Sequence, residues 1–313
     1  MLRFLFRRLL IAIPTLFVVI TLAFFMMRAA PGNPFMGQRR LAPEVERNVM
    51  AKYGLDRPLP VQYATYVGGV LHGDFGPSLK YKNKTVLQVI AAGFPKSLLI
   101  GGVAMILATV TGVALGIAAA LRQNRPIDYA TMTVAVLGIC IPTFVTAPLL
   151  VLVFGSRLGI LPIAGWPQSG QPLLSAARYL VMPILVLALP QVAIISRLVR
   201  AGMIEVLRSN YVRTARAKGL PEHSVVLRHA LRGAILPVVS YIGPATAGVI
   251  TGSLVVEQIF QLPGIGRAFV LSALQRDYTV VMGVVILYAA LILLLNLVAD
   301  LLYALLDPRV KLS

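Results

Sequence analysis

The stretch from Leu98 to Leu121, LLIGGVAMILATVTGVALGIAAAL, indicates what kind of protein this chain is. It contains 24 residues in a row, and none of them is charged. A helix that crosses the hydrocarbon core of a bilayer needs about 20 largely apolar residues. The stretch therefore predicts a transmembrane helix rather than a helix of a soluble core.

Five further stretches have the same character, and Asp300 is the only charged residue inside any of the six. The predicted spans are Leu9–Met27, Leu98–Leu121, Thr131–Phe154, Tyr179–Ile195, Ala234–Val256 and Val280–Leu306. We predict an all-α, polytopic membrane protein with six transmembrane helices, in which residues 1–313 form a single transmembrane domain.

The composition excludes several other classes. The chain is 58% hydrophobic and only 13% charged, against about 25% charged in soluble domains. This rules out a disordered chain and argues strongly against a soluble globule. The lone Cys140 excludes an internal disulfide. A net charge of +18 would suggest a nucleic-acid partner in a soluble protein, but here membrane topology explains it better.

The first apolar stretch follows Arg3, Arg7 and Arg8, as in a signal peptide. It is too long for the apolar part of a typical signal peptide, and Pro31 disfavours cleavage after Ala30. We interpret it as an uncleaved span. With the N-terminus inside, the short inner segments carry 15 Lys and Arg residues and the short outer loops carry four. The sequence therefore predicts that both termini are cytoplasmic.

The long outer segment, Ala29–Ser97, is predicted to be a folded, helical periplasmic loop. A helix is predicted from Pro43 to Lys52. Gly54 terminates it, because glycine readily adopts the left-handed backbone conformation that follows many helices. A second helix, Val61–Leu71, is ended by the sequence His72–Pro77. This segment either covers helix ends or docks an external partner, and the sequence leaves both open.

The inner segment, Ser196–Arg232, contains a short basic helix over Tyr211–Lys218, capped by Ser209 or Asn210. Gly219 suits the left-handed position that follows, Pro221 prevents continuation, and a second helix begins at Glu222. The small residues Ala215, Ala217 and Gly219 would let another surface approach the backbone. The short helix lacks the broad apolar face of a helix lying on a membrane surface, so protein docking is favoured.

The stretch YVRTARAKG, Tyr211–Gly219, resembles the "EAA" loop of permease subunits in binding-protein-dependent ABC importers. In that family the loop forms a coupling helix that inserts into a groove on the ATPase. Arg213-Thr214-Ala215 stands where the general pattern has Glu-Ala-Ala, so no glutamate role transfers to position 213. The resemblance implies that the coupling residues are Tyr211, Arg213, Thr214, Ala215, Arg216, Ala217, Lys218, Gly219 and Leu220.

Other motifs are similar to those of the B-type permease of oligopeptide and dipeptide importers. They are Phe25–Arg28, His72–Ser78, Leu262–Gly266, Arg276–Tyr278 and Asp307-Pro308. The resemblance implies a multi-pass protein of the bacterial inner membrane that moves oligopeptides or dipeptides inward by alternating access. It also implies a second, homologous permease, two ATPases that bind ATP and Mg²⁺, and an external peptide-binding protein.

The chain contains no phosphate-binding loop of its own, since Gly-Lys does not occur in it. We therefore expect no enzyme activity and no cofactor in this chain. The alternatives are an ion-coupled secondary transporter, an importer of another small solute such as nickel or glutathione, and a membrane enzyme. Neither H-E-x-x-H nor G-x-S-x-G is present, and Asp300 is expected to make an interhelical contact rather than a proton site.

Small residues recur every four positions on two spans, which predicts close helix packing there. They are Ala108, Gly112, Gly116 and Ala120 on the second span, and Gly248 and Gly252 on the fifth. Four prolines are positioned to bend the spans: Pro142, Pro148, Pro237 and Pro244.

The topology predicts where an impermeant thiol reagent can reach. In a Cys140→Ala background, Asn48→Cys should be labelled in intact cells, because the outer segment faces the outside. Arg216→Cys should be labelled only after the membrane is permeabilised. The reverse pattern would overturn both the orientation and the cytoplasmic position of the coupling helix.

Overall fold

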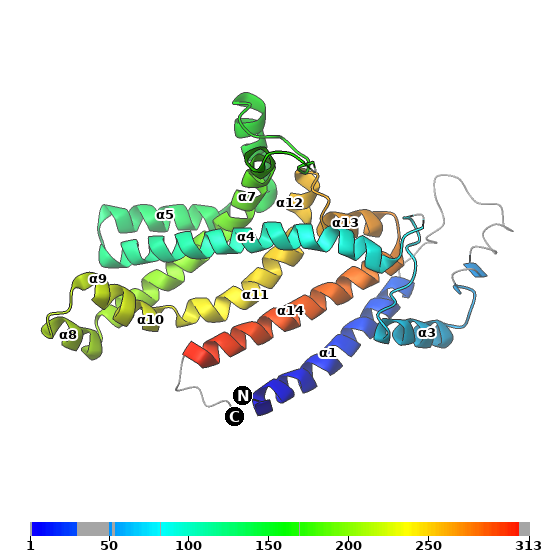
Figure 1. Ribbon diagram of the computed structural model, residues 1–313, viewed down its shortest axis with the longest axis horizontal. Helices are drawn as coiled ribbons and strands as arrows, with labels where there is room; N and C mark the ends of the chain where they lie inside the picture. Colours follow the sequence, from blue (N-terminus) through cyan, green and yellow to red (C-terminus); the bar gives the residue numbers. More distant parts are fainter. Residues whose placement is uncertain (1, 30–49, 52–53, 82, 169, 307–313) are drawn as a thin grey trace. The chain divides into compact units, whose positions relative to one another are not determined.

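The computed structural model describes residues 2–29, 50–51, 54–81, 83–168 and 170–306 (Figure 1). In these ranges all regular structure is helical, apart from one isolated antiparallel bridge between Pro77 and Thr85. The helices are α1 Leu2–Ala29, α3 Leu59–Leu71, α4 Val86–Leu121, α5 Pro126–Cys140, α6 Thr143–Leu150, α7 Leu173–Leu207, α8 Asn210–Ala217, α9 Glu222–Ser224, α10 Leu231–Ala234, α11 Leu236–Gly252, α12 Leu254–Ile259, α13 Ile265–Leu274 and α14 Tyr278–Leu306, with π-helical turns η1 Val151–Arg157 and η2 Val225–Ala230.

The predicted all-α, polytopic architecture is confirmed. Five helical segments of the described chain are long and apolar enough to cross a membrane, and a bent helix pair adds a sixth if its two parts form one span. The five are Arg8–Ala29, Val86–Leu121, Leu173–Leu207, Leu236–Ile259 and Tyr278–Tyr303. The helix predicted at Val61–Leu71 is also confirmed, as α3. The one predicted at Pro43–Lys52 lies outside the described residues, apart from Met50 and Ala51.

The third predicted span, Thr131–Phe154, is sharply bent, as the position of Pro142 within it predicts. It consists of Pro126–Cys140 and Thr143–Arg157, which are bent by 103° relative to each other. The cause is Pro142, which cannot donate a backbone hydrogen bond and disfavours the helical conformation in the preceding residue. Ile141 accordingly has extended backbone angles, with φ −87° and ψ 114°.

Two helices are much longer than their predicted spans. Helix α4 has 36 residues and α7 has 35, so each is about 50 Å long against a hydrocarbon core of about 30 Å. Helix α7 continues past Ile195 to Leu207, so the first part of the predicted inner segment Ser196–Arg232 extends the fourth span. Pro183 and Pro190 lie inside α7 without ending it.

The chain divides into two compact units. One comprises the residues up to Lys96 together with Pro263–Leu291, and the other comprises Ser97–Leu262 with the residues from Ile292 onward. In the first unit, the start of α4 packs on α13 and the start of α14 through Val86, Ile90, Ile265, Val280 and Val284. The second unit has the larger apolar core, built from α4, α7, η2 and α11.

The small-residue pattern of the second span packs as predicted. A Cβ atom added at Gly112 would lie 2.9 Å from the Ile195 side chain, and one at Gly116 would lie 2.7 Å from the Ser196 carbonyl oxygen. Helices α4 and α7 therefore touch almost backbone to backbone. Among the described residues of this chain, added Cβ atoms at Gly248 and Gly252 would meet nothing within 4 Å, so the close packing predicted for the fifth span is not found there.

Close packing at Gly116 gives a stability prediction. Gly116→Ala should lower the free energy of unfolding by about 1–3 kcal/mol, because α4 and α7 must separate to admit the methyl group. Gly102→Ala on the same helix is the matched control, since its Cβ would meet nothing within 4 Å. Thermal unfolding in detergent should show a lower Tm for Gly116→Ala only. Equal Tm values would contradict the packing.

Candidate functional site

The predicted basic helix is present as α8, Asn210–Ala217, one residue earlier than expected. Helix α7 ends at Leu207, so only Arg208 and Ser209 separate α7 from α8. Ser209 occupies the N-cap position, but its hydroxyl donates to the Val206 carbonyl oxygen at 2.6 Å rather than accepting a hydrogen bond from the new helix. The short connection through Arg208 and Ser209 fixes α8 directly to the end of α7.

The end of α8 is fastened by a left-handed glycine and an ion pair. Gly219 has φ +75°, as predicted, and its N–H donates to the Arg216 carbonyl oxygen. The Arg216 guanidinium binds Glu222 through two hydrogen bonds of 2.6 and 3.1 Å. This contact lowers the pKa of the Glu222 carboxyl, because the arginine stabilises its charged form. The pair ties α8 to α9 across the turn.

One expectation about this helix needs correction. Val212 and Ala215 are buried against the rest of the chain, since residues three apart lie on the same helical face. Ala215 therefore does not lie on the surface open to a partner. The other residues of the predicted set are exposed: Tyr211, Arg213, Thr214, Arg216, Ala217, Lys218, Gly219 and Leu220. The exposed residues therefore combine three basic side chains, Arg213, Arg216 and Lys218, with the small residues Ala217 and Gly219.

The buried face of α8 rests on η2 and the end of α7 (Figure 1). Val225, Val226 and Ala230 of η2 are buried in the same core. Glycines bring the neighbouring elements together, since a Cβ at Gly202 of α7 would lie 2.7 Å from the Ala234 carbonyl oxygen of α10. The basic helix is therefore mounted on a packed platform rather than on a loose loop.

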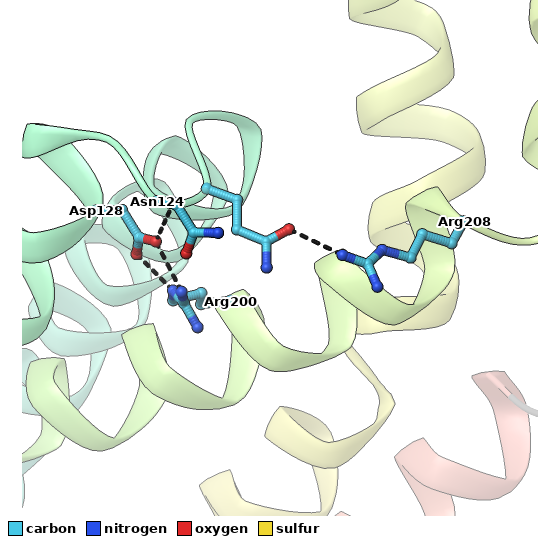
Figure 2. A network of polar contacts seen from close by, with 5 residues as sticks. Asn124, Asp128, Arg200 and Arg208 are labelled. Atoms are coloured by element: carbon cyan, nitrogen blue, oxygen red, sulfur yellow. Dashed lines mark hydrogen bonds and ion pairs between the residues drawn. The ribbon is translucent and has the colours of Figure 1, made fainter.

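A buried ion pair lies at the α4–α5 turn, and sequence reasoning missed it (Figure 2). Asp128, in the first turn of α5, accepts hydrogen bonds from Arg200 Nε at 2.5 Å and Arg200 Nη2 at 2.7 Å. Its second oxygen also accepts the Asn124 N–H at 2.9 Å. The available signal was Pro126 with an acid two residues later, which is typical of a helix start.

A second buried acid was also missed. Glu257 of α12 is fully buried and accepts hydrogen bonds from Ser97 Oγ at 2.5 Å and Ser253 Oγ at 2.7 Å. Because the apolar segment that begins at Leu236 extends to Ile259, Asp300 is not the only acid in the candidate spans. The predicted end at Val256 stopped one residue short of it.

In the unit that contains the outer segment, two of the motifs quoted above, His72–Ser78 and Arg276–Tyr278, meet. Asp277 is fully buried and accepts hydrogen bonds from Ser78 Oγ at 2.5 Å, the Leu79 N–H at 3.1 Å and Thr279 Oγ1 at 2.9 Å. The same Thr279 hydroxyl, which has a single proton to share, also lies 2.9 Å from the Pro77 carbonyl oxygen. One carboxylate therefore fixes the end of the outer segment to the start of α14, although about 200 residues separate them in sequence.

A cavity of about 270 Å³ lies beside this junction. Its walls combine aromatic residues with two arginines, and they include Phe24, Arg28, Arg57, Tyr66, Phe75 and Tyr278. Burial raises the pKa of the Tyr66 hydroxyl, so Tyr66 is a neutral group in this wall at physiological pH. The cavity belongs to the unit that carries the outer segment.

Comparison with known proteins shows the family of this chain. Residues 112–312 match the family model described as binding-protein-dependent transport system inner membrane component. The chain belongs to this family. Residues 1–100 match the model for the N-terminal part of binding-protein-dependent transport system membrane components.

Curated relatives align over their whole length. The oligopeptide transport system permease protein OppB of Salmonella typhimurium is 51% identical over 311 residues, covering 99% of this chain and 100% of the relative. OppB of Escherichia coli K12 is 50% identical over the same length. The dipeptide transport system permease protein DppB of Bacillus subtilis is 41% identical, covering 100% of this chain and 99% of the relative.

Solved structures share the fold at low sequence identity. The MetNI methionine ABC transporter in an inward-facing conformation matches 71% of this chain and 97% of its own, with a TM-score of 0.54 and 16% identity. An amino acid ABC transporter with histidines matches 72% and 95%, with a TM-score of 0.51 and 16% identity. The chain is a permease subunit of an ABC importer and a multi-pass protein of the bacterial inner membrane, which excludes the secondary transporter and the membrane enzyme.

The Asp277 junction yields a stability prediction. Asp277→Ala should lower the free energy of unfolding by about 2–4 kcal/mol, because several buried donors lose a carboxylate acceptor. Asp56→Ala removes the same charge from an exposed position of the same unit and should have little effect. Thermal unfolding of both variants checks this, and an unchanged Tm for Asp277→Ala would show that the junction is not stabilising.

Proposed function

We propose that this permease imports oligopeptides, which an external binding protein delivers, and that α8 receives the driving force from ATPase subunits. The observation that carries the proposal is a helix with exposed basic side chains, mounted on a packed platform at the end of α7, in a chain 51% identical to an oligopeptide permease. The 41% identity to a dipeptide permease keeps dipeptides as a second candidate substrate class.

The proposed partners follow from what the chain needs but lacks. Its sequence contains no Gly-Lys pair and hence no phosphate-binding loop, so two separate ATPases bind ATP and Mg²⁺ and hydrolyse the nucleotide. A second, homologous permease completes the pore. In this arrangement no cofactor binds to the chain itself.

The orientation follows from the charges. The basic segment around α8 and both termini lie on the cytoplasmic side, and Ala29–Ser97 lies outside. Residues 29–97 form the external region, and residues 196–232, of which the first part extends α7, carry the coupling loop. On this basis the Asp277 junction holds the outer segment in place where the binding protein delivers its cargo.

The proposed residues of contact with the ATPase are the exposed ones: Tyr211, Arg213, Thr214, Arg216, Ala217, Lys218, Gly219 and Leu220. Val212 and Ala215 hold the helix on its platform instead. When the ATPases close on ATP, they shift α8, and the direct connection through Arg208 and Ser209 passes that shift to α7. The transmembrane helices then alternate between outward-open and inward-open arrangements.

The exposed face of α8 provides the test. Ala217→Trp should leave the folded permease in the membrane, because Ala217 is exposed, but an indole should not fit a groove that closes on a methyl group. We expect ATPase association to weaken by about tenfold or more and peptide uptake to fall with it. Ala217→Ser keeps the small size and is the matched control.

Association is measured by co-purification of the ATPases, and uptake by ATP-driven accumulation of labelled peptides in proteoliposomes. In a Cys140→Ala background, Thr214→Cys should crosslink to an ATPase and not to the external binding protein. Wild-type association and uptake for Ala217→Trp would remove α8 as the docking element. If the wild-type complex accumulates no peptide, the proposal that peptides are its substrate is wrong.

A further inference from the structure

The ion pair between Asp128 and Arg200 has the geometry of a clamp between two helices (Figure 2). Two nitrogens of one guanidinium bind the two oxygens of one carboxylate, at 2.5 and 2.7 Å. The Asp128 side chain is only 2% exposed and that of Arg200 is 24% exposed. Such a bidentate, buried pair fixes both distance and orientation, unlike a single contact between flexible surface charges.

Burial makes this pair hard to break. Removing Arg200 would leave the Asp128 carboxylate, which is only 2% exposed, without its counter-charge, and this costs more than losing an exposed ion pair. The Arg200 side chain is 24% exposed and keeps some contact with water. The Asn124 N–H also donates to Asp128, and Asn124 has a left-handed backbone with φ +60°. The carboxylate thus organises the α4–α5 turn and holds α7 at the same time.

A second contact shows that α5 and α7 run antiparallel. A Cβ added at Gly138 of α5 would lie 3.3 Å from the Leu189 carbonyl oxygen of α7. From Asp128 to Gly138 is ten residues forward, and from Arg200 to Leu189 is eleven residues backward. Helix α5 is therefore fixed to α7 at two points about 15 Å apart, one polar and one by close backbone contact.

The ion pair between Asp128 and Arg200 lies near the end of α7 that leads into α8. Arg200 lies two turns before the end of α7, which leads through Arg208 and Ser209 into α8. Arg208 also donates from Nη2 to Gln123 Oε1 at 3.2 Å, which adds an exposed contact to the same turn. At its other end, α5 stops at the bend before Pro142, and α6 continues against α7 and α12.

We propose that Asp128 and Arg200 are positioning residues that make α5 move with α7 when the ATPases shift α8. The inference rests on the proposed function, because it assigns the route by which the same coupling site moves the bent third span. In this role neither residue needs to contact the peptide or the nucleotide. Their loss disconnects ATP hydrolysis from transport while the complex still assembles.

The experiment uses the complete complex in proteoliposomes, with both permeases, the ATPases and the binding protein. Asp128→Asn and Arg200→Gln should retain bound ATPases and basal ATP hydrolysis. Peptide uptake per ATP hydrolysed should fall by about tenfold, the size of a typical coupling between sites. Arg197→Gln removes the same charge from an exposed position of α7 and should keep the wild-type ratio.

A covalent replacement separates positioning from mere stability. In a Cys140→Ala background, Asp128→Cys with Arg200→Cys should be uncoupled, and a short thiol crosslinker between the two cysteines should restore uptake per ATP. Wild-type uptake in the single variants, or loss of ATPase association in them, would overturn the inference. So would an uncoupled crosslinked protein. A wild-type complex that hydrolyses ATP without peptide uptake would instead overturn the proposed function.

Discussion

The bilayer core contains no water to satisfy backbone N–H and C=O groups, and this constraint shapes the whole chain. A segment that crosses it must satisfy those groups within itself, which favours helices. Helices form here even where prolines in the sequence disfavour them. Pro183 and Pro190 stay inside a continuous α7, and the segment after Pro142 resumes as a helix. Among the described residues of the third span, the backbone becomes extended at Ile141 and Pro142, between the two helical parts.

The same constraint explains why the buried acids are all hydrogen-bonded. Asp128, Glu257 and Asp277 are almost fully buried, and each accepts at least two hydrogen bonds. A charged group away from water is tolerated only with such partners. Each acid also joins segments far apart in sequence: α5 to α7, α4 to α12, and the outer segment to α14. These polar contacts therefore help to set which helices are held together, beside the apolar cores.

A permease has to keep some helix pairs fixed while others move. The close contacts between α4 and α7 at Gly112 and Gly116, and the clamp from α5 to α7, make α7 the common partner in its unit. Helix α8 follows α7 almost directly. A force applied to an exposed, basic face at this end is thus delivered to a helix that already holds several others.

The sequence by itself determined the six spans, the helix at Tyr211–Lys218 and the turn at Gly219. The reason is that apolar length, proline and glycine act locally, through the bilayer and through backbone angles. The motifs also pointed to the family, which the comparisons confirmed. Tertiary structure decided the rest. Whether Ala215 faces a partner or the chain depends on what packs beneath α8, and the open space at Gly248 depends on which helices are neighbours. The pairing of Asp128 with Arg200 joins residues 72 positions apart, which no local pattern encodes.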